Sequence, residues 1–135
     1  MQKVFLDTNI IIDLLAQREP FYKDAQALFT LADRGQIELQ ISALSFANAS
    51  YALSKYHQVA TAKKYLQQFK VLVSILPLDD KTIELALASE FQDIEDGFQY
   101  FTALTHGAKV IITRNKKDFK AAQLPVLNAS EYLSR

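Results

Sequence analysis

Residues 4–13 read VFLDTNIIID, an apolar run that is interrupted by one acid and then resumes. A run of four to eight apolar residues with β-branched and aromatic members is typical of a central strand in a parallel sheet. Asp7 ends this run, and a second apolar segment at helical spacing follows, so a strand ends and a helix begins here. In open α/β sheets, ligands and catalytic groups collect at this edge. The stretch therefore predicts a central strand that presents Asp7 at a functional edge.

The composition is that of one folded domain. The 135 residues are 50% hydrophobic, with three Gly, three Pro and no Cys, which favours a compact core over disorder. Without Cys there is no disulfide, thiolate metal site or thiol nucleophile. No apolar run approaches the ~20 residues that span a bilayer, and Asp7 comes too early for a signal peptide. We expect a soluble, cytoplasmic protein with no membrane contact.

The charge is balanced, with a formal net charge of zero. The chain therefore has no global basic field that would indicate nucleic-acid binding. Residues 114–120 carry four basic side chains and one acid. This local cluster is a candidate contact for a phosphate backbone, and a solvated basic turn is an equally good interpretation of it.

Apolar spacing and turn residues divide the chain into alternating strands and helices. Strands that alternate with helices imply a mostly parallel sheet that is covered on both faces. We expect a single domain over residues 1–135, an α/β fold in which a three-layer α/β/α sandwich holds a central, mostly parallel sheet of four or five strands. The helical spacing also directs Tyr56, Tyr65 and Leu87 inward. Further strands are expected at 37–41, 71–76, 109–113 and 126–127, and helices at 9–16, 20–34, 42–56, 60–69, 78–87, 91–106 and 130–133.

Polar side chains follow several strands at the point where each strand ends. Asp7 follows the first strand, Ser42 and Ser45 follow the second, and Asn115 and Asp118 follow the fourth. The carboxyl ends of parallel strands share one edge of a sheet, so these side chains should lie close together.

Two more acids, Asp93 and Asp96, begin the helix that precedes the fourth strand. Being three residues apart, they would share one helix face. The order of the strands alone does not bring this helix start to the edge that holds Asp7.

Each acid also has an ordinary structural interpretation. Asp7 taken alone is more often a helix N-cap, Asp93 and Asp96 resemble a capping box, and Asp118 resembles one half of a surface ion pair. His57 and His106 have no second His or Cys at ligand spacing, so zinc is not expected. The remaining acids on helices are interpreted as solvated or capping: Asp13, Asp24, Asp33, Asp79 and Asp80.

The acids indicate a function only in combination. Three or four carboxylates in one cleft would raise one another's pKa unless a cation were present. Oxygen donors without Cys or paired His select Mg²⁺ or Mn²⁺. A site of this kind lowers the pKa of a coordinated water and neutralises charge on a phosphodiester.

Three segments together resemble the PIN domain, in particular the compact prokaryotic type related to VapC toxins. They are VFLDTNIIID at 4–13, DIEDGFQY at 93–100 and IITRNKKDF at 111–119. The resemblance covers essentially the whole chain. It implies a metal-dependent endoribonuclease that uses Mg²⁺ or Mn²⁺, is the toxin of a type II toxin–antitoxin pair with a small antitoxin protein as partner, and forms a homodimer.

The resemblance also implies roles for individual residues. Asp7, Asp96 and Asp118 would be the catalytic metal ligands, and Asp93 would support them at the metal or at a second metal. Asn9, Thr113 and Asn115 would line or brace the pocket. The RNA backbone contacts would fall to the basic residues Arg114, Lys116 and Lys117.

One position departs from the family's pattern. The helix after the second strand usually presents a Glu to the site, whereas this chain has Asn48 in the supporting pocket. An amide can ligate a metal or hold a water, but it adds no negative charge and cannot act as a general base. The three remaining acids favour an enzyme in which an activated water attacks the scissile phosphorus in line and leaves a 5′-phosphate.

Other classes of protein fit part of the pattern. A non-catalytic PIN-like module that binds RNA or a protein, with a weakened metal site, is favoured by Asn48 and by the zero net charge. A phosphohydrolase of the haloacid-dehalogenase type needs an acid where this chain has Asn9. A phosphoryl-receiver domain needs an acceptor Asp where the third strand ends in Leu76 and Pro77.

Overall fold

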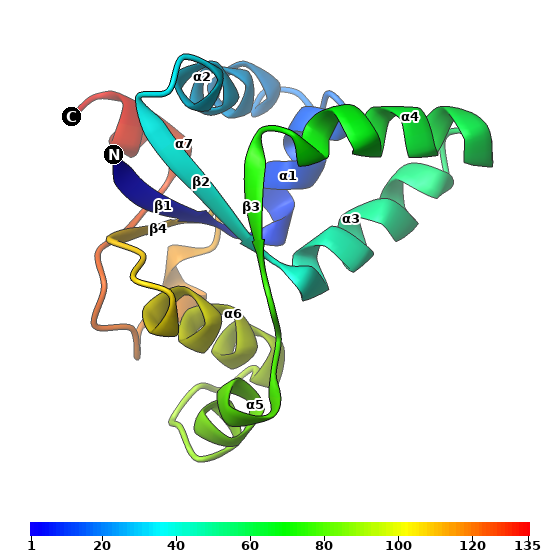
Figure 1. The fold of residues 1–135 in the computed structure, drawn as a ribbon. Coiled ribbons are helices and arrows are strands. Elements are labelled where there is room, and N and C mark those ends of the chain that lie inside the picture. Colours follow the sequence, from blue (N-terminus) through cyan, green and yellow to red (C-terminus); the bar gives the residue numbers. More distant parts are fainter.

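A computed structural model describes residues 1–135. Five strands form one sheet in the order β3-β2-β1-β4-β5, and every neighbouring pair is parallel (Figure 1). This confirms the predicted α/β architecture with a parallel sheet. The strands are β1 (Gln2–Leu6), β2 (Ile37–Ser42), β3 (Val73–Leu76), β4 (Val110–Ile112) and β5 (Val126–Leu127).

Helices connect these strands and cover both faces of the sheet (Figure 1). None of them combines the length and the apolarity that crossing a membrane requires. The predicted basic turn contains a short 3-10 helix, η1 (Lys116–Phe119). The α-helices are α1 (Thr8–Leu15), α2 (Tyr22–Asp33), α3 (Ala43–Ser54), α4 (Val59–Lys70), α5 (Asp80–Leu87), α6 (Ile94–Thr105) and α7 (Ala129–Leu133).

The central strand β1 pairs with β2 on one side and with β4 on the other. The chain proceeds outward from β1 through β2 to β3, then crosses back to β4 and ends at β5. The strand order therefore reverses between β1 and β4. In open α/β sheets, ligands bind outside the carboxyl ends of the strands at such a reversal.

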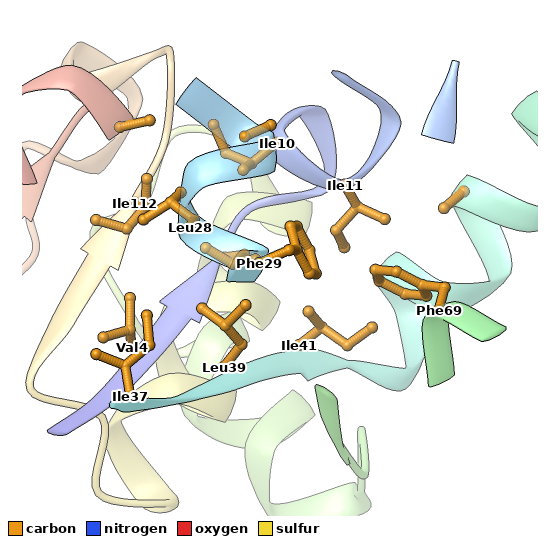
Figure 2. Close-up of a cluster of buried hydrophobic side chains, with 14 of the residues drawn as sticks. Val4, Ile10, Ile11, Leu28, Phe29, Ile37, Leu39, Ile41, Phe69 and Ile112 are labelled. Atoms are coloured by element: carbon orange, nitrogen blue, oxygen red, sulfur yellow. The ribbon is translucent and has the colours of Figure 1, made fainter. Parts of the chain in front are cut away.

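Alternating side chains of the central strands supply two separate cores. Val4 and Leu6 point into the larger core, which α1 and α2 cover with Ile10, Leu28 and Phe29 (Figure 2). On the opposite face a smaller core contains, among others, Phe5, Tyr100, Ala103, Ile111 and Phe119. Because β1 is buried on both faces, it is the rigid centre of the fold.

Helices α3 and α4 extend beyond the β3 edge of the sheet (Figure 1). Phe69 of α4 anchors this pair, since its ring lies 5.4 Å from that of Phe29. The predicted inward positions of Tyr56, Tyr65 and Leu87 are wrong, because these side chains are 71%, 40% and 63% exposed. Tyr56 lies beyond the end of α3, the Tyr65 ring packs edge-on against the His57 ring at 5.1 Å instead of entering the core, and Leu87 is the last residue of α5.

Polar side chains at the starts of four helices accept hydrogen bonds from backbone N–H groups of the first turn. Asp7 and Ser42 cap α1 and α3 at the ends of β1 and β2. Asp79 and Asp93 cap α5 and α6, which confirms the capping interpretation of these acids. Gly107 follows α6 with a φ of 79°, a left-handed conformation that ends the helix.

Candidate metal centre at the carboxyl edge of the sheet

The start of α6 lies at the same edge of the sheet as Asp7. A helix that leads into a parallel strand runs antiparallel to that strand, so α6 begins at the carboxyl edge and ends beside the start of β4. A hydrogen bond of 3.1 Å from Gln99 Nε2 of α6 to Thr8 Oγ1 joins the two segments. This geometry brings Asp93 and Asp96 to the site, a placement that strand order alone left open.

Asp7 is nearly buried and its two carboxylate oxygens have different partners. Oδ1 accepts a hydrogen bond from the Thr8 backbone N–H at 2.9 Å, and Oδ2 accepts one from Thr113 Oγ1 at 2.8 Å. Burial raises the pKa of Asp7, the hydrogen bonds from Thr113 and Thr8 act against this, and the negative charge of Asp118 adds to it. The fully buried Thr113 also accepts a hydrogen bond from the Asn115 backbone N–H at 3.1 Å.

Asp96 lies in the first turn of α6 and shows the strongest electrostatic coupling of the site. Burial raises its pKa to about 7, and the negative charges of Asp93, Asp7, Asp118 and Glu95 contribute to that rise. Acids from two distant segments, Asp7 and Asp118, therefore act on this carboxylate together with its neighbours on α6, as expected for groups that converge on one site.

A cavity of about 480 Å³ opens beside these acids. Asp93 and Asp96 line it from the start of α6, while Asp118, Lys117 and Lys120 line it from η1 and the residue that follows. Asp118 forms no ion pair, so its interpretation as half of a surface ion pair is wrong.

The donor chemistry of the site fits a hard divalent cation. Asp96 and Asp118 line the cavity without any His or Cys, and the charge of Asp7 acts on Asp96; carboxylate oxygens of this kind suit Mg²⁺ or Mn²⁺. No three of the protein's His, Cys, Asp and Glu side chains stand close enough to hold a metal ion as placed. Like charges keep carboxylates apart, and a bound divalent cation would offset that repulsion.

The supporting residues predicted from the sequence have different surroundings. Asn48 Nδ2 on α3 donates a hydrogen bond of 3.1 Å to Glu95 Oε1. A carboxylate thus lies beside the position where a Glu was expected. Asn9 is half-buried, and its backbone carbonyl accepts a hydrogen bond from Arg18 Nη2 at 3.2 Å.

Arg114 is held by α1. Its Nε lies 3.0 Å from Asp13 Oδ2, and its guanidinium stacks over the Phe21 ring at 4.0 Å. Asp13 is 1% exposed and also pairs with Arg18 at 2.9 Å. The interpretation of Asp13 as a solvated or capping acid is therefore wrong, since helical spacing cannot reveal an arginine that arrives from 101 residues along the chain.

The three basic residues predicted to contact RNA differ in whether an acidic side chain of the protein already pairs with them. Lys116 Nζ pairs with both carboxylate oxygens of Glu131, at 2.9 and 3.0 Å, and Arg114 is bound to Asp13. Lys117 lines the acidic cavity together with Lys120, which the sequence analysis did not single out.

Sequence reasoning missed two residues of the site. Glu95 contacts Asn48, and Gln99 is buried against the polar ends of β1 and β2. The signal for Gln99 was available: it is an amide on the inner face of α6, three residues after Asp96.

Comparisons with known proteins agree with this architecture. The family model described as PIN domain matches residues 3–117. The chain is 30% identical over 142 aligned residues to "Ribonuclease VapC1" of Aquifex aeolicus (strain VF5), an alignment that covers 99% of this chain and 95% of that protein.

Solved structures share the fold. The chain superimposes on a toxin-antitoxin complex from Klebsiella pneumoniae with a TM-score of 0.71 and 25% identity, covering 93% of this chain and 97% of that one. A DNA-bound VapBC from Salmonella typhimurium matches with a TM-score of 0.70 and 20% identity, covering 96% and 99%.

Proposed function

This chain belongs to the PIN-domain family, and from that premise we propose that it is a metal-dependent endoribonuclease that hydrolyses RNA phosphodiester bonds. The observation that carries the proposal is that Asp93, Asp96 and Asp118 line one cavity at the carboxyl edge of the sheet, where Asp7 follows β1. Burial, and then the charges of Asp93, Asp7, Asp118 and Glu95, raise the pKa of Asp96 to about 7, in keeping with this convergence. A site that concentrates so much negative charge is suited to a divalent cation. The 30% identity to a ribonuclease along 99% of this chain supports the reaction class.

Asp7, Asp96 and Asp118 would hold Mg²⁺ or Mn²⁺, with Asp93 as an additional acid at the same mouth. When bound, the cation would lower the pKa of a water and offset charge on the phosphodiester. Thr113 fixes one oxygen of Asp7 and leaves lone pairs of the carboxylate for a ligand. Asn9, Asn48 and Asn115 would brace the pocket and orient water.

Lys117 is the strongest candidate of the basic segment for holding the RNA backbone. It lines the cavity that contains Asp96 and Asp118, and Lys120 lines the same cavity. Arg114 and Lys116 would contribute less, because Asp13 and Glu131 already neutralise them. The lysines would contact a substrate phosphate directly. A cation held by the acids would offset the charge of that phosphate.

We also propose that this chain is a toxin that a small antitoxin protein binds, and that it forms a homodimer. The matched structures from Klebsiella pneumoniae and Salmonella typhimurium are described as a toxin-antitoxin complex and a VapBC, which supports a type II toxin role for this chain. A small reading frame next to this gene, with a product that binds the chain and blocks RNA cleavage, would identify that partner.

Removing single carboxylates tests the reaction. Asp7→Asn should keep the fold, since Asn also caps a helix well, and Asp96→Asn should keep it because the substitution conserves the shape of the side chain and no hydrogen bond depends on it. Both variants should lose Mn²⁺-dependent RNA cleavage. The loss should exceed the ~10–100-fold that removing an outer partner of a metal ligand costs. Cleavage is measured on a labelled RNA, with circular dichroism as the check on folding.

The control for this test is Asp33→Asn. Asp33 is exposed at the end of α2, which leads into β2 and therefore ends at the opposite edge of the sheet. It should cleave like the wild-type protein. Undiminished cleavage by both site variants would overturn the proposal.

The second candidate is a PIN-like module that binds RNA or a protein without cutting it. Asn48 favours this function, because it adds no charge where the resemblance leads one to expect a Glu. The nearby Glu95 carboxylate, 3.1 Å from the Asn48 amide, supports the enzyme instead. Calorimetric titration with Mn²⁺ separates the two, since the binding module should show no stoichiometric metal site.

A further inference from the structure

Gln99 has the most completely bonded buried amide at the site. It is 1% exposed and lies on α6, facing the carboxyl ends of β1 and β2. Its Oε1 accepts a hydrogen bond from Ser42 Oγ at 2.6 Å. Its Nε2 donates to Ser45 Oγ at 2.5 Å and to Thr8 Oγ1 at 3.1 Å. Both donor hydrogens of the amide are therefore used, and so is its oxygen.

The three hydroxyl partners belong to two different strand–helix junctions. Thr8 is the first residue of α1 and directly follows Asp7. Ser42 is the last residue of β2 and caps α3, accepting a hydrogen bond from the Ser45 N–H at 2.9 Å. The Thr8 and Ser45 hydroxyls lie 2.7 Å apart. Gln99 thus closes one buried polar network that joins α6 to both junctions.

Asp96 precedes Gln99 by three residues, so both side chains lie on the same face of α6. The network therefore fixes the turn of the helix that presents Asp96. Electrostatic repulsion opposes this placement, because the negative charges of Asp93, Asp7 and Asp118 act on the Asp96 carboxylate. Apolar packing of Tyr100 and Ala103 holds α6 on the sheet, and the hydrogen bonds of Gln99 add directional contacts that restrict the rotation of the helix and its position along its axis.

We propose that Gln99 is a positioning residue of the metal centre, whose amide holds the first turns of α6, and with them Asp96, in register with Asp7. This inference rests on the proposed function. Gln99 is 1% exposed and its amide is used by three hydroxyl partners, which leaves it no role in direct contact with RNA or metal. It acts only through Asp96.

Gln99→Met tests the role, because Met has a similar length and no hydrogen-bonding amide. Mn²⁺ affinity, measured by calorimetry without RNA, should fall, by at most the ~10–100-fold that losing a direct hydrogen-bond partner of a metal ligand costs. At subsaturating Mn²⁺ the kcat for RNA cleavage should fall while the KM for RNA stays close to wild type.

Gln40→Met is the matched control. Gln40 is also a buried amide, 2% exposed, and its Nε2 donates to the His106 carbonyl at 3.3 Å, beside the far end of α6. Both variants lose a buried amide, so both should lose stability. Only Gln99→Met should lose Mn²⁺ affinity, and only Gln99→Met should show faster amide hydrogen exchange at residues 94–98 of the metal-free protein.

Ser45→Ala provides a second route if Gln99→Met does not fold. It removes one partner of Gln99 without touching an acid, and it should lower Mn²⁺ affinity less than Gln99→Met. Wild-type Mn²⁺ affinity in Gln99→Met or, failing its folding, in Ser45→Ala would overturn the inference and leave the proposed function intact. Absence of a Mn²⁺ site in the wild-type protein would overturn both.

Discussion

The carboxylate of Asp7 shows how one residue serves the fold and the candidate site together. Its Oδ1 caps α1 through the Thr8 N–H, and its Oδ2 accepts from Thr113. A carboxylate offers about four lone-pair positions, so two hydrogen bonds leave others for a cation. The helix-cap interpretation is therefore correct for Asp7, and it does not compete with the proposed role as a metal ligand.

Asp96 makes the stability of the metal-free protein depend on pH. Its pKa is about 7 in the folded protein and about 4 in an unfolded chain. Between these values the folded state holds a proton that the unfolded state has released, so stability should fall as the pH rises from about 4 to about 7. Asp7, whose pKa is also raised, acts in the same direction.

Urea unfolding at several pH values in the presence of a chelator measures this dependence. Asp96→Asn should reduce the slope between pH 4 and 7, because position 96 no longer titrates and only the contribution of Asp7 remains. Asp33→Asn, at the other edge of the sheet, should keep the wild-type slope. A wild-type slope in Asp96→Asn would contradict the assignment.

At the scale of elements, two sets of polar contacts fix the parts of the chain that bring Asp96 and Asp118 to the carboxyl edge of β1. Helix α6 is fixed by the Gln99 network, and the segment after β4 is fixed to α1 by the Asp13–Arg114 ion pair. Arg114 precedes Asn115 and η1, which carries Asp118. The ion pair therefore helps to position the segment that carries the last acid of the site, together with the buried Phe119 of η1.

Arg114→Met should destabilise the protein rather than weaken RNA binding selectively. The substitution leaves the buried Asp13 carboxylate with Arg18 as its one ionic partner. Breaking a fully buried pair costs at least about 3 kcal/mol. The cost here should be lower, because Arg114 is partly exposed and Arg18 remains. Lys116→Met removes an exposed ion pair and should cost much less stability than Arg114→Met. Thermal unfolding of both variants makes the comparison, and equal stabilities would contradict it.

At the scale of the whole molecule, the candidate site joins parts of the chain that are far apart in sequence. Asp7 comes from the end of β1, Asp96 from α6 and Asp118 from η1. A cation that binds all three would stabilise the folded state, because the unfolded chain cannot bring them together.

Mn²⁺ should therefore raise the unfolding temperature of the wild-type protein. At 100 times the dissociation constant, the gain is about 2.7 kcal/mol, or about 10 °C for a domain of this size. Differential scanning fluorimetry with and without Mn²⁺ measures it. Asp96→Asn should show little shift, and a wild-type protein without any shift would favour the non-catalytic module.

Much of the architecture could be predicted because it depends on local patterns. The run at 4–6 identified β1, and the capping interpretations of Asp7, Asp79 and Asp93 agree with where helices begin. Tyr56 and Leu87 were placed wrongly, because apolar spacing describes a helix face and not whether another element covers it.

The sequence by itself determined the α/β class, the strand that carries Asp7 and the acids from which a metal site could be built. These features follow from hydrophobic periodicity, capping chemistry and residue type, which act over a few positions. Only the tertiary structure decided that α6 begins at the edge of Asp7, that Gln99 fixes it there, and that Asp13 and Glu131 neutralise Arg114 and Lys116. Those contacts join residues 15 to 101 positions apart, and chain reversal, not local pattern, brings such residues together.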